Sequence, residues 1–197
     1  MKKISLIIGT ITTIFIAVAC GNQNEVKPTT TTTISNDSLV KMGEYLVNTI
    51  GCDDCHSPKV MGPKGPEVDM SKRFSGHPAD QALPKVDAAQ TKSYILFSPG
   101  QTAYVGPWGT SYAANITSDQ TGIGNWTEQQ FIKAMREGKS KGLDGGRMIL
   151  PPMPWLNLAK LKDQDLKAVF AYLKSTTPIE NHVPSPLPPN QLASIEK

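Results

Sequence analysis

The stretch Cys52-Asp53-Asp54-Cys55-His56 decides how the rest of this chain is interpreted. Its spacing, C-x-x-C-H, is typical of the attachment of a c-type haem. Two thiols at this spacing add across the two vinyl groups of one porphyrin, and the imidazole of the next residue binds the iron as proximal ligand. The motif therefore predicts one covalent haem c held by Cys52, Cys55 and His56.

Two other uses of paired cysteines fit the sequence less well. A thioredoxin-like redox pair follows a strand in a βαβ unit, and no such alternation is present here. A structural zinc site needs a second pair of ligands, but the chain has only one other cysteine, Cys20.

The first 19 residues have the pattern of a lipoprotein signal peptide. Lys2 and Lys3 precede an uncharged apolar run over 4–18, and small residues lead into Cys20. We expect Cys20 to be acylated and to begin the mature, exported chain. The alternatives are a plain signal peptide cut near Ala19 and an uncleaved membrane anchor, for which the apolar run is short.

The remaining chain divides into a tether, one domain and a tail. Residues 20–37 are predicted as a lipidated N-terminus with a flexible threonine-rich tether, because Thr29 to Thr33 show no apolar periodicity. Residues 38–185 form the predicted domain, and 186–197 form a C-terminal tail. A net charge of only +3 gives no electrostatic reason to expect nucleic-acid binding.

Apolar spacing predicts helices at about 38–50, 127–138 and 163–174. Ser38 and Thr127 are expected to cap the first two helices at their N-termini, with Gln130 completing the capping pattern at Thr127, and Gly51 and Gly138 are expected to end these helices. The expected buried faces are Leu39, Met42, Leu46 and Ile50 in the first helix, Phe131, Ile132 and Met135 in the second, and Leu166, Val169, Phe170 and Leu173 in the third.

The residues between the haem motif and the second helix are rich in proline and glycine. We therefore expect 57–113 to be a long loop-rich insertion, with a small hairpin in which 94–97 pairs with 102–105. The fold class predicted is mainly α, with about three to four short helices around a covalent haem.

The iron needs a second axial ligand, and Met153 is the strongest candidate. The run Leu150-Pro151-Pro152-Met153-Pro154-Trp155 is stiff and non-helical, which suits a thioether that must hold its place. Met148 is the best alternative, whereas His77 and His182 are expected at the surface. Arg147 and three tryptophans are further candidates for contacts around the haem, namely Trp108, Trp126 and Trp155.

Iron held by His56 and Met153 has six ligands and no open position for oxygen or peroxide. The ligand set therefore favours an electron carrier over an enzyme. The alternative is a haem enzyme or gas sensor in which the distal ligand is labile or absent.

The chain resembles class I c-type cytochromes, in particular the single-haem domains related to the cytochrome subunits of membrane-linked bacterial dehydrogenases. The resemblance covers about residues 38 to 185. The matching residues are Gly43 to Leu46, Cys52 to His56, Asn115 to Thr117, Gly122 to Trp126, Phe131, Arg136 to Gly138, Pro152 to Trp155, Asp165 to Ala168 and Tyr172 to Lys174.

The resemblance implies further features. In the family, the methionine of the Pro-Met-Pro segment is the distal ligand, which corresponds here to Met153. The first and last helices of the family cross near the haem edge, which implies Gly43 and Tyr45-Leu46 against Tyr172-Leu173. The chain departs from dehydrogenase subunits in carrying a single C-x-x-C-H motif, where those subunits often carry several.

The expected role is the transfer of single electrons between respiratory or dehydrogenase partners. The partners expected are a quinol-oxidising complex, a dehydrogenase, or a terminal oxidase or reductase. The expected location is at a membrane through the lipid on Cys20, facing the periplasm or the outer side of the cytoplasmic membrane.

Overall fold

The computed structural model describes residues 35–87 and 89–194. The predicted signal peptide, Cys20 and nearly all of the predicted tether lie outside the described residues. The helices are α1 (Asn36–Ile50), α2 (Cys52–His56), α3 (Glu128–Glu137), α4 (Trp155–Leu158) and α5 (Asp163–Ser175), and the strands are β1 (Lys59–Gly62), β2 (Gly65–Val68), β3 (Leu96–Phe97), β4 (Ala103–Gly106) and β5 (Gly109–Tyr112).

The expectation of a mainly α fold is corrected, because two small antiparallel sheets accompany these helices. One sheet pairs β1 with β2, and the other has the order β3-β4-β5. The pairing of β3 with β4, in which Leu96 faces Val105, is the hairpin that the sequence predicted. Within the described residues, no helix combines the length and apolar character needed to cross a bilayer.

The N-cap of helix α1 lies three residues earlier than predicted. The Ser35 hydroxyl, not that of Ser38, caps it by accepting from the Ser38 amide at 3.3 Å. Gly51 ends the helix in the left-handed conformation, as expected. The residues fully buried on α1 are Gly43 and Val47, so the buried face is rotated from the predicted one.

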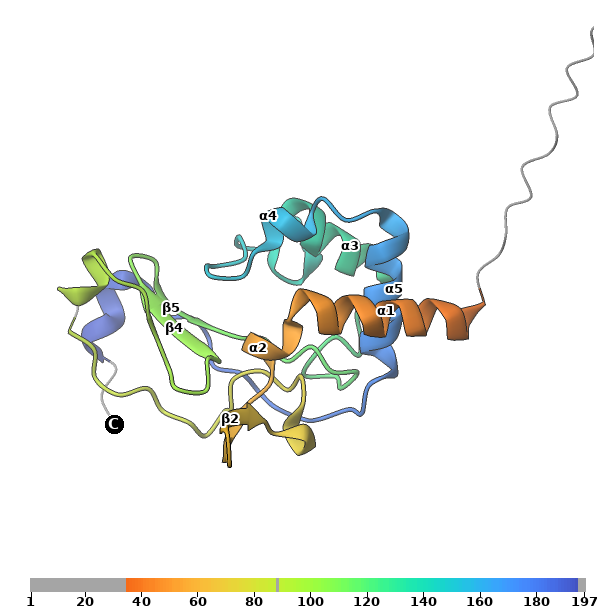
Figure 1. The fold of residues 1–197 in the computed structure, drawn as a ribbon. Coiled ribbons are helices and arrows are strands. Elements are labelled where there is room, and N and C mark those ends of the chain that lie inside the picture. Colours follow the sequence, from red (N-terminus) through yellow and green to blue (C-terminus); the bar gives the residue numbers. More distant parts are fainter. Residues whose placement is uncertain (1–34, 88, 195–197) are drawn as a thin grey trace, which may run out of the picture. The chain divides into compact units, whose positions relative to one another are not determined.

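Helices α1 and α5 cross each other and form the most extensive contact between the described elements (Figure 1). Gly43 permits this approach, because a Cβ there would lie 2.7 Å from the Cβ of Tyr172 and would also overlap the carbonyl of Ala168. The predicted contact of Gly43 with Tyr172 is therefore confirmed. Tyr45 of the expected contact is instead 68% exposed.

The main apolar core joins α1, α3 and α5. Thr127 and Gln130 form the predicted capping box of α3, and Gly138 ends that helix. All four residues predicted on the inner face of α5 are buried, whereas Ala134 of α3 takes the buried place expected for Ile132. The phenyl rings of Phe131 and Phe170 lie 5.2 Å apart between their centroids and tie α3 to α5.

His77 is fully buried, which corrects the expectation that it lies at the surface. Its Nε2 lies 2.9 Å from the Gln81 carbonyl oxygen, and its Nδ1 lies 2.9 Å from the Thr102 hydroxyl. Because a carbonyl only accepts, Nε2 carries the proton and Nδ1 accepts from Thr102. His77 is thus a packed link between distant parts of the insertion, while His182 is exposed as predicted.

We expect Gly43→Ala to destabilise the protein, although alanine is the better helix former. The added methyl must push α1 away from the α5 backbone, and overpacking of this kind costs about 1–3 kcal/mol. Urea unfolding followed by circular dichroism measures the change. Gly145→Ala is the control, because a Cβ at Gly145 meets nothing within 4 Å; a Gly43→Ala protein as stable as the wild type contradicts the packing argument.

We expect the stabilising contribution of His77 to weaken in acid. Burial lowers the pKa of His77 below its usual 6.5, against the opposing effect of its bond to Gln81. The contribution is therefore complete above about pH 6.5 and declines as the pH falls through the lowered pKa.

The unfolding free energies of wild type and His77→Gln, measured from pH 8 to pH 5, test this expectation. Their difference should shrink toward acid, because only the wild type gains stability from a neutral imidazole at position 77. A difference that stays constant with pH contradicts the assignment of a neutral His77.

Candidate haem site

One cavity of about 550 Å³ contains every residue predicted to hold the haem. Cys52, Cys55 and His56 line it from α2, and Met153 lines it from the segment before α4. Part of the remaining wall belongs to the main apolar core, including Ile116, Ile123, Phe131, Met135, Leu166 and Val169. The wall is thus largely apolar, and its sulfur and imidazole donors are Cys52, Cys55, His56, Met135, Met153 and His182.

His56 is oriented by a backbone carbonyl. Its Nδ1 lies 2.7 Å from the carbonyl oxygen of Ala114, and because that oxygen only accepts, Nδ1 carries the proton. Burial lowers the pKa of His56, although the bond to Ala114 opposes the shift. The imidazole is therefore neutral at ordinary pH, with the Nε2 lone pair left for a metal ion.

A segment of the insertion supports this geometry. We call residues 73–77 the strap, because they run between the haem motif and the segment that bears Ala114. The amide of Gly76 donates to the His56 carbonyl at 2.8 Å, and the amide of His77 donates to the Ala113 carbonyl at 2.9 Å. The strap thereby fixes the distance between His56 and its hydrogen-bond acceptor.

The two cysteines are free thiols on a short helix that directly follows α1. Burial, with a smaller contribution from Asp53, raises the pKa of Cys52 to about 11. Cys55 Sγ lies 3.0 Å from the Tyr104 hydroxyl, which itself lies 2.7 Å from the Gln101 carbonyl. Sequence patterns gave no sign of Tyr104, because it reaches Cys55 from strand β4, 49 positions away.

Met153 is half-buried on the cavity wall, in the proline-framed loop 150–154. The hydroxyl of Ser111 on β5 donates to the Pro151 carbonyl at 2.6 Å and holds the start of this loop. Met148, the alternative ligand, is 43% exposed and is not among the residues that line the cavity. The geometry therefore brings Met153, and not Met148, together with the haem motif.

The methionine loop is also fastened to the end of α3. The amide of Ile149 donates to the Gly138 carbonyl at 2.7 Å, and the indole of Trp155 lies against Gly138. A side chain at Gly138 would overlap this ring. Trp155 therefore supports the loop from outside the cavity.

The predicted haem contacts other than the ligands lie partly on the cavity wall and partly outside it. Trp126 and Arg147 line the cavity, whereas Trp108 and Trp155 are not among the lining residues. Burial lowers the pKa of Arg147, whose Nη1 donates to the Met148 carbonyl at 2.9 Å. Met135 of α3 is a second cavity methionine, but it packs within the main core and is only 8% exposed.

The donor set fits a c-type haem. Two thiols and an imidazole with a free Nε2 lie on one short helix, a thioether lies on the same cavity, and the walls are apolar. Within residues 35–87 and 89–194, no three His, Cys, Asp or Glu side chains converge as a metal cluster. The cavity thus brings an imidazole with a free Nε2 together with a thioether, two ligand types that haem iron takes.

Comparison with known proteins finds relatives among cytochrome subunits, although no family model matches the chain. The gluconate 2-dehydrogenase cytochrome c subunit of Pantoea cypripedii is 34% identical over 139 residues, 70% of this chain and 23% of that protein. The cytochrome c subunit of the quinone alcohol dehydrogenase of Gluconobacter oxydans is 30% identical over 139 residues, 70% of this chain and 21% of that protein. The fructose dehydrogenase cytochrome subunit of Gluconobacter japonicus is 37% identical over 97 residues, 49% of this chain and 19% of that protein.

These comparisons confirm the resemblance read from the sequence. The chain is related to the cytochrome c subunits of bacterial dehydrogenases, and this relation supports electron transfer as its class of function. The chain spans less than a quarter of the length of each of these relatives.

We expect the protein without haem to be poorly folded, because the cavity lies within its main core. A Cys52→Ala/Cys55→Ala variant should unfold at lower urea concentration and less cooperatively than the haem-loaded wild type. Circular dichroism and tryptophan fluorescence measure this change, and a haem-free protein with native-like cooperativity contradicts it.

Proposed function

We propose that this chain is a monohaem c-type cytochrome that is exported, anchored to a membrane by a lipid on Cys20, and faces the periplasm or the outer side of the cytoplasmic membrane. In this proposal Cys52 and Cys55 hold one haem c covalently, while His56 and Met153 are the axial ligands of its iron. The chain transfers single electrons and is not itself an enzyme. The observation that carries the proposal is the shared cavity of the C-x-x-C-H motif and Met153.

The haem supplies a one-electron Fe(III)/Fe(II) couple. The protein supplies the positions of the ligands and the exclusion of water. The carbonyl of Ala114 keeps the His56 ring in one orientation, and the fastened methionine loop holds the thioether against the same cavity. Ligands fixed on both sides change little between two oxidation states, which favours rapid electron exchange over the binding of oxygen or peroxide.

Met153 is favoured over Met135 as distal ligand because of its setting. Met135 belongs to a regular helix, where it packs in the main core. Met153 belongs to an irregular loop and lies at the margin of that core. A loop pinned at Pro151 and next to Gly138 presents the Met153 side chain to the cavity.

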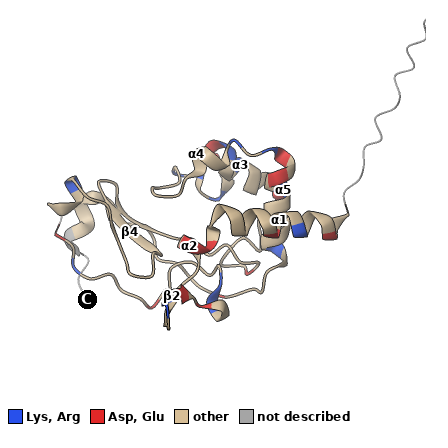
Figure 2. Ribbon diagram, in the orientation of Figure 1, with Lys and Arg blue, Asp and Glu red and all other residues tan. Residues whose placement is uncertain are grey.

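The partners proposed are redox proteins: a dehydrogenase, a quinol-oxidising complex, or a terminal oxidase or reductase. A dehydrogenase is favoured by the names of the relatives. Figure 2 shows positions of Lys and Arg interspersed with positions of Asp and Glu along the described ribbon, and the formal net charge is only +3. Such a charge balance gives no strong long-range steering toward a charged partner, so we propose that docking depends on short-range fit.

We expect Met153→Leu to abolish the weak absorption band near the red end of the oxidised spectrum, which is the sign of methionine ligation in this family. Leucine keeps the volume of methionine but has no sulfur to give to the iron. The visible spectrum of protein matured in a host that attaches haem c provides the measurement, with carbon monoxide binding to the reduced form as a second readout.

Met148→Leu and Met135→Leu are the matched controls and should both retain the band. Loss of the band in either control, with retention in Met153→Leu, contradicts the assignment of the ligand. A wild-type protein that is high-spin and binds carbon monoxide rapidly instead indicates a haem enzyme or gas sensor, and a colourless preparation rejects the cytochrome altogether.

A further inference from the structure

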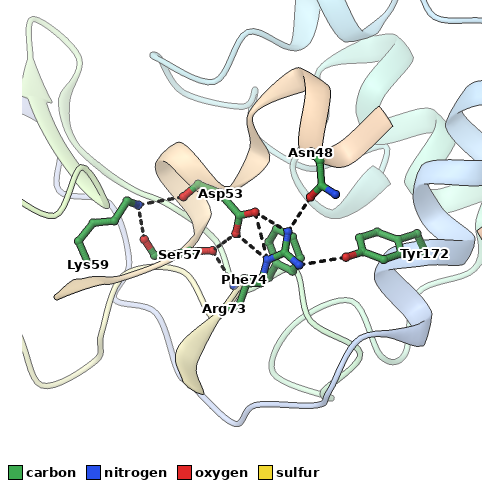
Figure 3. Close-up of polar contacts among 7 residues, drawn as sticks. All are labelled: Asn48, Asp53, Ser57, Lys59, Arg73, Phe74 and Tyr172. Atoms are coloured by element: carbon green, nitrogen blue, oxygen red, sulfur yellow. Dashed lines mark hydrogen bonds and ion pairs between the residues drawn. The ribbon is translucent and has the colours of Figure 1, made fainter. Parts of the chain in front are cut away.

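Arg73 lies at the centre of a polar cluster between the haem motif and the crossing of α1 with α5 (Figure 3). Its Nε donates to the two carboxylate oxygens of Asp53 at 3.0 and 3.1 Å, and its Nη2 lies 2.6 Å from Asp53 Oδ2. Asp53 stands directly after the first haem cysteine in the sequence. The guanidinium group of Arg73 thus binds helix α2, which carries the haem motif.

The same guanidinium also binds both crossing helices. Nη2 donates to the side-chain oxygen of Asn48 on α1 at 2.7 Å, and Nη1 donates to the Tyr172 hydroxyl on α5 at 3.2 Å. One side chain therefore connects α1, α2 and α5. Lysine, with a single nitrogen, cannot reproduce these directions at once.

The backbone next to Arg73 is held in an unusual conformation. Phe74 has a φ of +63°, which is strained for a bulky residue. Its amide donates to the Ser57 hydroxyl at 2.8 Å, and that hydroxyl donates to Asp53 Oδ1 at 2.6 Å. The guanidinium carbon of Arg73 lies 4.3 Å from the centroid of the buried Phe74 ring. These contacts hold Phe74 in its strained conformation, and the same contacts place Arg73 beside Asp53.

The charges of this pair are shielded from water. The side chains of Arg73 and Asp53 are 23% and 20% exposed. Charges in such a setting act over longer distances than charges at the surface, because the surrounding dielectric constant is lower. Lys59 also binds this region, but its ammonium donates to the backbone carbonyls of Asp53, Asp54 and Ser57 and not to the carboxylate.

We propose that Arg73 is a positioning residue for the haem motif, and that its ion pair with Asp53 sets the charge beside the iron and thereby the reduction potential. This inference rests on the proposed haem site. On this view the insertion acts on the redox centre through one side chain. Arg73 fixes α2 against the helix crossing and neutralises Asp53, one of the two carboxylates between the cysteines.

The test is a double-mutant cycle of reduction potentials, measured by redox titration of the haem-loaded proteins. Arg73→Gln leaves the Asp53 carboxylate unpaired, which favours ferric iron, so the midpoint should fall. Asp53→Asn leaves the guanidinium unpaired, which favours ferrous iron, so the midpoint should rise. At the wild-type midpoint, the ferrous fraction should therefore be below one half in the first variant and above one half in the second.

The double variant Arg73→Gln/Asp53→Asn should return toward the wild-type midpoint, because both charges are gone. Arg73→Lys should also remain near it, since the cation is kept even though the fork is lost. Lys133→Gln, which removes a cation from the exposed pair with Asp144, is the control for a general change in charge and should leave the midpoint unchanged.

A merely structural role predicts a different pattern. If loosening of the motif is the cause, both single variants move the midpoint in the same direction and the double variant does not restore it, and that result overturns the inference. If Arg73→Gln retains no haem, the comparison of Asp53→Asn with the double variant remains: the single variant must lie higher. A wild type that carries no haem instead removes the proposed function, so the two failures are distinguishable.

Discussion

The hydrogen bond from His56 Nδ1 to the carbonyl of Ala114 is the constraint on which the proposed centre depends. This bond sets the tautomer of the His56 imidazole and the direction of its free Nε2. The acceptor is a backbone carbonyl oxygen, which has little freedom to move. Ala114 is in turn next to Ala113, whose carbonyl binds the strap at His77. The orientation of one ring is thereby linked to the packing of a long insertion.

The insertion has more structure than its proline and glycine content indicates. It contributes the strap, the three-stranded sheet that carries Tyr104, and the serine that holds the methionine loop. The C-terminal residues 187–192 pack against this sheet, since the Thr110 amide donates to the Leu187 carbonyl at 2.8 Å and Leu192 is buried. Each part reaches the cavity by one or two directed bonds and not by a broad apolar face.

What the sequence predicted well depends on local signals. The capping box of α3, the glycines that end α1 and α3, and the inner face of α5 are encoded within a few positions, so their periodicity and caps were sufficient. The haem motif and the proline-framed Met153 are also local signals, and their roles as haem ligands stay predictions. The two segments are far apart in the sequence, but one iron ion with a ligand from each requires that they lie close together in the fold.

What the sequence did not predict depends on contacts between distant positions. Strand β5 is the segment Gly-Thr-Ser-Tyr, which has no alternation of apolar residues even though its first three residues are buried. His77 is buried because Thr102 and Gln81 satisfy its ring, and nothing adjacent to it in sequence signals those partners. Arg73 and Tyr172 are 99 positions apart. A charged residue in a proline-rich loop is normally solvated, so only the fold reveals that this one is enclosed beside the haem motif, where the charge of a carboxylate must be balanced.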